Sequence, residues 1–200
     1  MKFLIDTSAH NLERRMSESK IVLGQLLTPL TRYRHWGGVY AIDNGAFSNF
    51  DEKNYKTLLA RQDKFKDDCL FVTCPDIVGA GQRSVEIYKH RRRWIPEGWK
   101  CALVVQDGSE NIEIPWDDMD CVFIGGKDPW KDSQCVLDIV RTAKILDKWV
   151  HVGRVNEKKR FDHFANAGAD TCDGSGIARF DYKLRKIETR MPVLWDTIAC

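Results

Sequence analysis

The chain has 200 residues, of which 43% are hydrophobic, and its 31 lysines and arginines nearly balance 29 aspartates and glutamates. This length and hydrophobic share suffice for a substantial core, and no Pro-, Gly- or Ser-rich linker divides the chain, so we expect one domain over residues 1–200. The formal net charge of +2 excludes a chain that is basic throughout, so any nucleic-acid contact requires a local basic segment.

Short runs of apolar and β-branched residues recur along the chain and predict eight strands. The runs are almost continuously apolar rather than alternating, which is typical of parallel strands that are covered on both faces. The predicted strands are Lys2–Ile5, Val39–Ile42, Cys69–Thr73, Cys101–Val105, Cys121–Ile124, Val150–Val152, Ala169–Cys172 and Pro192–Trp195.

Segments with helical spacing lie between several of these strands. Gly168 is expected to follow the last of these segments, Glu157–Ala167, and to terminate that helix. In the third, an apolar stripe recurs at intervals of three and four residues: Val136, Ile139, Val140, Ala143 and Leu146. The predicted helices are Asn54–Phe65, Gln82–Trp94, Lys131–Leu146 and Glu157–Ala167.

The region 11–36 is less distinct. Leu12–Ser19 is compatible with a helix, and Ile21–Leu27 with either a strand or a helix. The alternation elsewhere predicts an α/β fold with right-handed crossovers, either a doubly wound sheet or a barrel. Eight strands favour a compact (β/α)8 TIM-like barrel, and because 200 residues is short for that fold, some helices should be shortened or missing.

Polar residues and glycines follow the predicted strands directly. In both α/β architectures the functional groups gather at the carboxyl ends of the strands, so these residues should converge on one mouth. Crowded carboxylates there should raise at least one pKa unless a cation compensates, which indicates acid/base or nucleophilic chemistry. The strand-end sequences are Asp43-Asn44-Gly45-Ala46-Phe47, Cys74-Pro75-Asp76, Gln106-Asp107-Gly108, Gly125-Gly126, Gly153-Arg154 and Asp173-Gly174.

Asp173 is the strongest candidate for a nucleophile or base. It stands at a strand end, and Gly174 and Gly176 allow the backbone to turn sharply and approach a ligand closely. The alternatives are structural: an aspartate often opens a Gly-rich turn, and Asp or Asn often caps a helix, which would suffice for Asp107.

The order of these motifs from Val39 to Arg179 resembles the tRNA-guanine transglycosylases, and within that superfamily the shorter 7-deazaguanine DNA transglycosylases of phages and bacteria. The resemblance implies that Asp173 attacks the anomeric carbon of a guanosine and forms a covalent glycosyl-enzyme. It implies that Asp43 transfers the proton of the leaving and incoming bases, with retention of configuration and no cofactor.

The same resemblance implies a binding site for the base. Asp76 would read the guanine edge, Gln106 and the Gly126 backbone N–H would donate to its carbonyl oxygen, and Phe47 and Val152 would sandwich the ring. For Phe47 and Val152, ordinary core packing is an equal alternative. The implied substrate-binding residues are Phe47, Asp76, Gln106, Gly125, Gly126, Val152, Gly153 and Arg179, the last beside sugar and phosphate.

The chain departs from the tRNA enzymes in lacking their zinc segment. After Asp173 the only cysteine is Cys200, and no histidine follows His163. His151 and His163 are therefore expected to be structural, and no metal is expected. Seven cysteines without ligand spacing, and an N-terminal apolar run of only Phe3–Ile5, indicate a cytoplasmic protein that does not enter a membrane.

DNA is therefore the expected polymer, with a free 7-deazaguanine as second substrate. The basic run Lys89–Trp94 offers Arg91, Arg92 and Arg93 as phosphate contacts, although such a run is often only a solvated helix face. The target nucleotide would have to be flipped out or single-stranded. The alternatives are a tRNA-specific enzyme, a noncatalytic nucleobase-binding subunit and a barrel hydrolase that releases the base to water.

Overall fold

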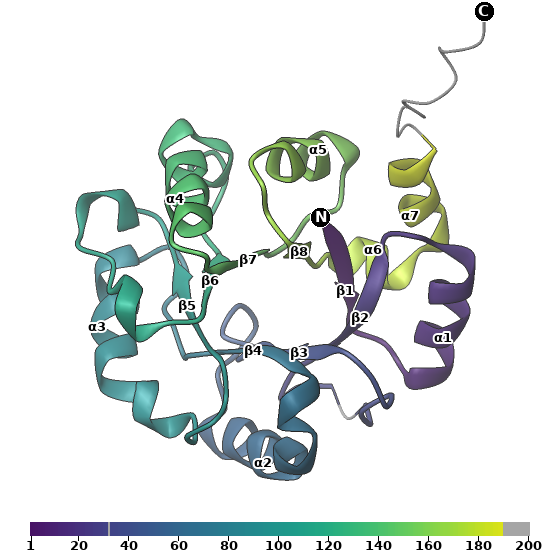
Figure 1. Cartoon of the computed structure of the whole chain (residues 1–200), viewed down its shortest axis with the longest axis horizontal. Coiled ribbons are helices and arrows are strands. Elements are labelled where there is room, and N and C mark those ends of the chain that lie inside the picture. Colours follow the sequence, from purple (N-terminus) through teal and green to yellow (C-terminus); the bar gives the residue numbers. More distant parts are fainter. Residues whose placement is uncertain (32, 190–200) are drawn as a thin grey trace, which may run out of the picture.

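Eight parallel strands close into a barrel in the computed structural model, in the order in which they occur in the chain (Figure 1). The structure describes residues 1–31 and 33–189. The predicted compact (β/α)8 TIM-like barrel is thus confirmed. The strands are β1 (Lys2–Ile5), β2 (Val22–Leu27), β3 (Tyr40–Ile42), β4 (Cys69–Thr73), β5 (Cys101–Val105), β6 (Cys121–Ile124), β7 (Trp149–Val152) and β8 (Thr171–Cys172).

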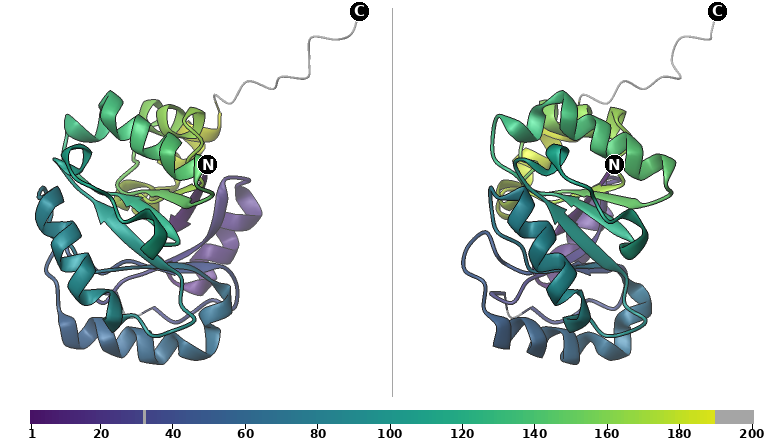
Figure 2. Two further views of the ribbon diagram at one scale, coloured as in Figure 1. Left: turned by 60° about the vertical axis from the view of Figure 1, so that its left-hand side comes forward. Right: turned by 90° about the vertical axis from the view of Figure 1, so that its left-hand side faces the viewer.

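Helices surround the barrel, as Figure 1 and the side views in Figure 2 show. Between β5 and β6 the chain forms only the short 3-10 turns Ser109–Asn111 and Trp116–Asp118, which agrees with the expectation of missing helices in so short a chain. None of the described helices is long and apolar enough to cross a membrane. The α-helices are α1 (Ala9–Glu18), α2 (Glu52–Gln62), α3 (Gly81–Arg91), α4 (Gln134–Ile145), α5 (Lys158–Asn166), α6 (Ser175–Arg179) and α7 (Asp181–Glu188).

One strand of the barrel, β2, comes from the region 11–36, where the sequence was compatible with either a strand or a helix. Val22–Leu27 forms β2, and the barrel closes where Lys2 pairs with Thr171 and Phe3 with Cys172. The strand predicted at Pro192–Trp195 lies outside the described residues. The strand ends predicted to carry the chemistry are therefore those of β3 to β8.

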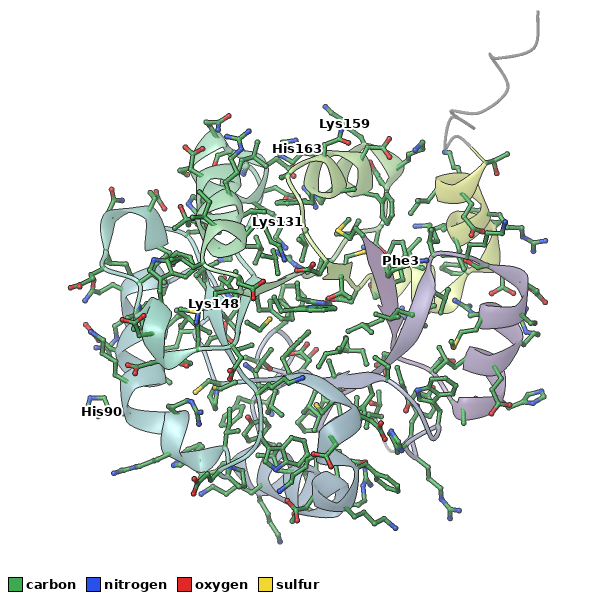
Figure 3. All side chains as sticks on the ribbon, viewed as in Figure 1. Phe3, His90, Lys131, Lys148, Lys159 and His163 are labelled. Atoms are coloured by element: carbon green, nitrogen blue, oxygen red, sulfur yellow. The ribbon has the colours of Figure 1, made fainter. Side chains whose placement is uncertain are left out.

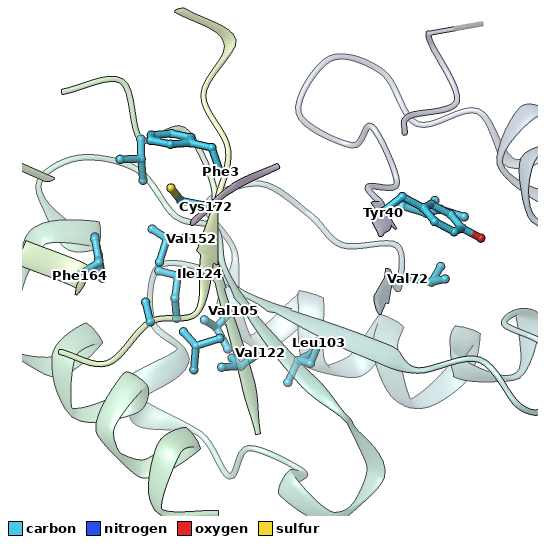
Figure 4. Close-up of a cluster of buried hydrophobic side chains, with 14 of the residues drawn as sticks. Phe3, Tyr40, Val72, Leu103, Val105, Val122, Ile124, Val152, Phe164 and Cys172 are labelled. Atoms are coloured by element: carbon cyan, nitrogen blue, oxygen red, sulfur yellow. The ribbon is translucent and has the colours of Figure 1, made fainter. Parts of the chain in front are cut away.

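Strand alternation divides the core into two layers. In β6, Phe123 faces the barrel interior, whereas Val122 and Ile124 face the helices. Aliphatic residues, a cysteine and two phenylalanines fill the narrow interior, and a larger apolar layer fills the space between strands and helices (Figure 4). The interior layer comprises Leu4, Leu26, Ala41, Phe71, Ala102, Val104, Cys121 and Phe123.

The helix ends follow local chemistry. The side chain of Asp51 caps α2 by accepting the N–H of Asn54 at 2.9 Å. Gly168 adopts a φ of +96° after α5, as predicted for a residue that ends a helix. In α4 the predicted stripe is buried up to Ala143, but Leu146 lies past the helix end and is 43% exposed.

Candidate active site

A pocket opens at the carboxyl ends of the strands, as expected for this fold. It contains all of the predicted catalytic and substrate-binding residues except Val152 and Arg179. The lining residues are Asp43, Asn44, Phe47, Asp76, Val78, Val104, Gln106, Phe123, Gly125, Gly126, Lys131, Gly153, Arg154 and Asp173.

Asp173 follows β8, and both of its carboxylate oxygens have partners. Oδ1 accepts the backbone N–H of Arg154 at 3.2 Å, and Oδ2 lies 3.2 Å from Nε2 of His151. The side chain is 17% exposed. The carboxylate is therefore held in one orientation at the pocket, as a fixed nucleophile requires.

Two glycines allow this close packing around Asp173. A Cβ at Gly153 would lie 2.8 Å from Phe123 and 3.4 Å from Oδ2 of Asp173. A Cβ at Gly174 would lie 2.2 Å from the carbonyl oxygen of Val155. The glycines expected beside the ligand position are thus required by the packing around Asp173.

Asp43 follows β3 and faces the same pocket. Its Oδ1 accepts the N–H of Gly45 at 3.3 Å and the hydroxyl of Thr73 at 3.5 Å. Burial, together with the nearby carboxylates of Asp173 and Asp76, raises the pKa of Asp43 to about 7. The crowding predicted from the strand ends therefore produces a carboxyl group that can give and take protons near neutral pH.

Asp76 is held in a network of amides. Asn44 Nδ2 donates to its Oδ1 at 2.8 Å, and Gln106 Nε2 donates to its Oδ2 at 2.6 Å. Burial raises the pKa of Asp76, and the bonds from Asn44 and Gln106 oppose that rise. Gln106 Oε1 accepts the backbone N–H groups of Gly126 at 2.7 Å and Gly79 at 3.0 Å. The backbone N–H of Gly126, which is expected to donate to a base, thus donates a hydrogen bond to Gln106 in this structure.

Val152 does not line the pocket. Its side chain is fully buried and packs in the layer between the sheet and the helices, near Ile124 and Phe164 (Figure 4). The reason is the alternation of β7, where His151 faces the barrel interior and the next residue must face outward. Val152 is therefore packed in the core, and the predicted contact of its side chain with a base does not fit this position.

Arg154 lines the pocket beside Phe47. Its guanidinium lies 4.6 Å from the centroid of the Phe47 ring and also donates to the carbonyl oxygen of Gly126. Arg154 has a φ of +60°, which is uncommon for a residue with a long side chain and often marks a functional site. Phe47 is 63% exposed, so it is no core residue.

Lys131 and Asp6 were not predicted. Lys131 is fully buried and its Nζ donates to the carbonyl oxygen of Gly153 at 2.7 Å (Figure 3). Burial and the positive charge of Arg154 lower its pKa to about 7. As the first residue of the expected helix Lys131–Leu146, it had no sequence feature that marks a site residue. Asp6, by contrast, directly follows a predicted strand, and its burial raises its pKa to about 6.

Arg179 lies on α6 and lines a groove that adjoins the pocket. The groove shares Asp43, Phe47 and Asp173 with the pocket and extends past Asp6. The predicted position of Arg179 beside the reacting nucleotide is therefore compatible with the structure.

Arg91, Arg92 and Arg93 lie outside the barrel at the end of α3 and in the turn that follows. The guanidinium of Arg91 stacks 4.5 Å from the ring of Trp94. None of the three arginines lines the pocket or the adjoining groove. The structure therefore does not bring this basic run to the site.

Metal ligands do not gather in the described part of the chain, where no three His, Cys, Asp or Glu side chains are placed to hold an ion. The six described cysteines are free. No protein-family model matches the chain, and no curated protein matches it.

Proposed function

We propose that the protein is a base-exchange transglycosylase that replaces guanine in DNA by a free 7-deazaguanine. The observation that carries the proposal is the pairing of two carboxyl groups in one pocket. Asp173 is oriented through both oxygens, and Asp43 has a pKa of about 7. One is suited to nucleophilic attack and the other to proton transfer.

In the first step, an oxygen of Asp173 attacks C1′ of the target nucleotide. The C1′–N9 bond breaks, its electron pair leaves with guanine, and Asp43 supplies the proton that neutralises the departing base. In the second step, N9 of the 7-deazaguanine loses its proton to Asp43 and attacks C1′, which expels Asp173. Two inversions give overall retention.

The base is recognised by Asp76, whose two oxygens can accept the ring N–H and the exocyclic amino group together. Binding requires Gln106 and Asn44 to share or release their bonds to this carboxylate. Phe47 supplies one face of the site. Arg154 rather than Val152 supplies the other: its guanidinium, which lies 4.6 Å from the centroid of the Phe47 ring, moves outward so that the base stacks between the two planar groups.

DNA is the proposed polymer because the strand-end motifs resemble those of the shorter 7-deazaguanine DNA transglycosylases. A duplex would have to present a flipped-out nucleotide, since C1′ is otherwise inaccessible to a carboxylate fixed within a barrel mouth. Arg179 is the proposed contact to the backbone beside that nucleotide.

The test is incorporation of labelled guanine into duplex DNA and into tRNA. We expect incorporation into DNA, a trapped covalent protein–DNA adduct for the wild type, and neither for Asp173→Asn. Asp67→Asn, a change at an exposed position, is the matched control and should behave as the wild type. Incorporation into tRNA alone would overturn the choice of polymer, release of the base without incorporation would indicate a hydrolase, and undiminished exchange by Asp173→Asn would refute the mechanism.

A further inference from the structure

Four side chains form a hydrogen-bonded row inside the barrel that ends at Asp173. Trp149 Nε1 donates to Oγ1 of Thr171 at 2.9 Å, and the same oxygen lies 2.9 Å from Nδ1 of His151. His151 Nε2 lies 3.2 Å from Oδ2 of Asp173. The row alternates between β7 and the β8 segment, because the inward-facing positions of paired parallel strands lie side by side.

The chemistry of the two ends determines where every proton of this row lies. The indole of Trp149 can only donate, so Thr171 Oγ1 accepts at that contact and is free to donate its own proton to Nδ1 of His151. At the other end an ionised Asp173 can only accept, so Nε2 of His151 must carry its proton. Both ends therefore select the same neutral tautomer.

The opposite tautomer would leave two contacts unsatisfied. A proton on Nδ1 would give Thr171 Oγ1 two donors, and its own proton would have no acceptor among the contacts that the described residues make. The bare Nε2 lone pair would then face the Asp173 carboxylate at 3.2 Å, which is repulsive. Leaving buried polar groups unpaired destabilises the folded chain, so this tautomer is disfavoured.

The imidazole is also kept uncharged. His151 is fully buried, with the rings of Phe71 and Phe123 centred 5.0 and 4.6 Å away. Burial lowers the pKa of His151, Lys131 adds to that effect, and the Asp173 carboxylate opposes it.

We propose that His151 is a positioning residue for the nucleophile: Trp149 and Thr171 select its Nε2–H tautomer, which holds Oδ2 of Asp173. A neutral donor orients the carboxylate without the full ion pair that would weaken its nucleophilicity. The positioning role rests on the proposed function, whereas the tautomer does not.

The tautomer is tested by ¹⁵N NMR of the imidazoles in the wild-type protein. The chain has five histidines, and the resonances that disappear in His151→Gln identify His151. We expect a protonated, pyrrole-type Nε2 and an unprotonated Nδ1 at neutral pH. A protonated Nδ1, alone or together with Nε2, would overturn the proposal.

The positioning role is tested by the rate of covalent adduct formation with DNA in a single turnover. His151→Gln keeps an N–H donor for Oδ2 and should stay within a few-fold of the wild type, whereas His151→Leu should lose about tenfold or more. Thr171→Val should reduce the rate less than His151→Leu and should populate the second tautomer in the NMR spectrum.

The affinity for DNA should be unchanged in all three variants, because none of the altered groups lines the pocket. Equal losses in His151→Gln and His151→Leu, or a loss confined to DNA affinity, would contradict the positioning role. A wild-type protein that forms no adduct would refute the proposed function and the role with it, while the NMR spectrum would still decide the tautomer.

Discussion

Asp43 shows how position alone changes the chemistry of a common side chain. Burial and two neighbouring carboxylates raise its pKa from 3.8 to about 7, because each makes ionisation more costly. An ordinary surface aspartate would be fully ionised at neutral pH and could not supply a proton to a departing base. The proposed proton transfer therefore depends on the crowding of carboxylates at the barrel mouth.

A pH profile tests this role. We expect kcat/KM for base exchange, measured from pH 5 to 9, to have an inflection near pH 7 that reports Asp43 in the free enzyme. Asp43→Asn should lower the rate by about 10²–10⁴-fold and remove that inflection. An unchanged profile in Asp43→Asn would assign the proton transfer to another group.

Arg154 is expected to bind the base through stacking. Arg154→Ala should raise KM for the free base by about tenfold with a smaller effect on kcat, since the guanidinium contacts a pocket face rather than the reacting atoms. Arg154→Lys should restore little, because an ammonium group is not planar. Arg141→Ala, at an exposed site on α4, is the control. Equal KM values in all four proteins would exclude the stacking role.

At the scale of elements, the arginines considered for DNA binding lie in two places: Arg91–Arg93 at the end of α3 and in the turn after it, and Arg179 on α6. A helix between parallel strands returns the chain toward the amino ends of the strands, and Arg91 at the end of α3 stacks on Trp94 rather than facing the groove. The short α6 begins two residues after Asp173, so Arg179 stays beside the mouth.

This difference predicts unequal effects on DNA binding. Arg179→Gln should weaken the affinity for DNA and reduce the steepness of its salt dependence by about one unit. Simultaneous change of Arg91, Arg92 and Arg93 to Gln should affect affinity less and instead lower stability by about 0.5–1 kcal/mol, through the lost stack on Trp94. Binding isotherms at several salt concentrations and thermal unfolding distinguish the two; a larger loss of affinity in the triple variant would contradict the assignment.

At the scale of the whole molecule, the buried ionisable groups of the site lower the free energy of unfolding. Because Asp43 has a higher pKa in the folded chain, the folded state binds more protons between about pH 4 and 7, and the free energy of unfolding falls as pH rises through that range. Lys131 acts in the opposite sense: its pKa falls from 10.5 to about 7, so the unfolded state binds more protons above pH 7 and stability rises there.

Asp43→Asn should therefore be more stable than the wild type at pH 8, by about 1–3 kcal/mol, and should show no such gain at pH 4. Denaturant unfolding at the two pH values measures this difference, with Asp67→Asn as the control at an exposed position. A variant that is equally destabilised at both values would show that the buried carboxylate does not cost stability.

The sequence alone determined the strands β1 and β3 to β8 and the residues that follow them. Apolar runs can be read locally because both faces of each strand are buried, and the carboxyl ends of parallel strands must meet at one mouth. The strand ends therefore predict one common site for four residues, which do line one pocket: Asp43, Asp76, Gln106 and Asp173.

Only the tertiary structure decided which way each side chain points and what lies behind it. In the closed barrel the side chain of Val152 points outward and that of His151 points inward. A continuously apolar strand sequence does not show which residues face which side. It also brought Lys131, whose segment resembled an ordinary amphipathic helix, to the backbone of Gly153. Such contacts join residues that are distant along the chain, so their energies depend on packing across strands rather than on local pattern.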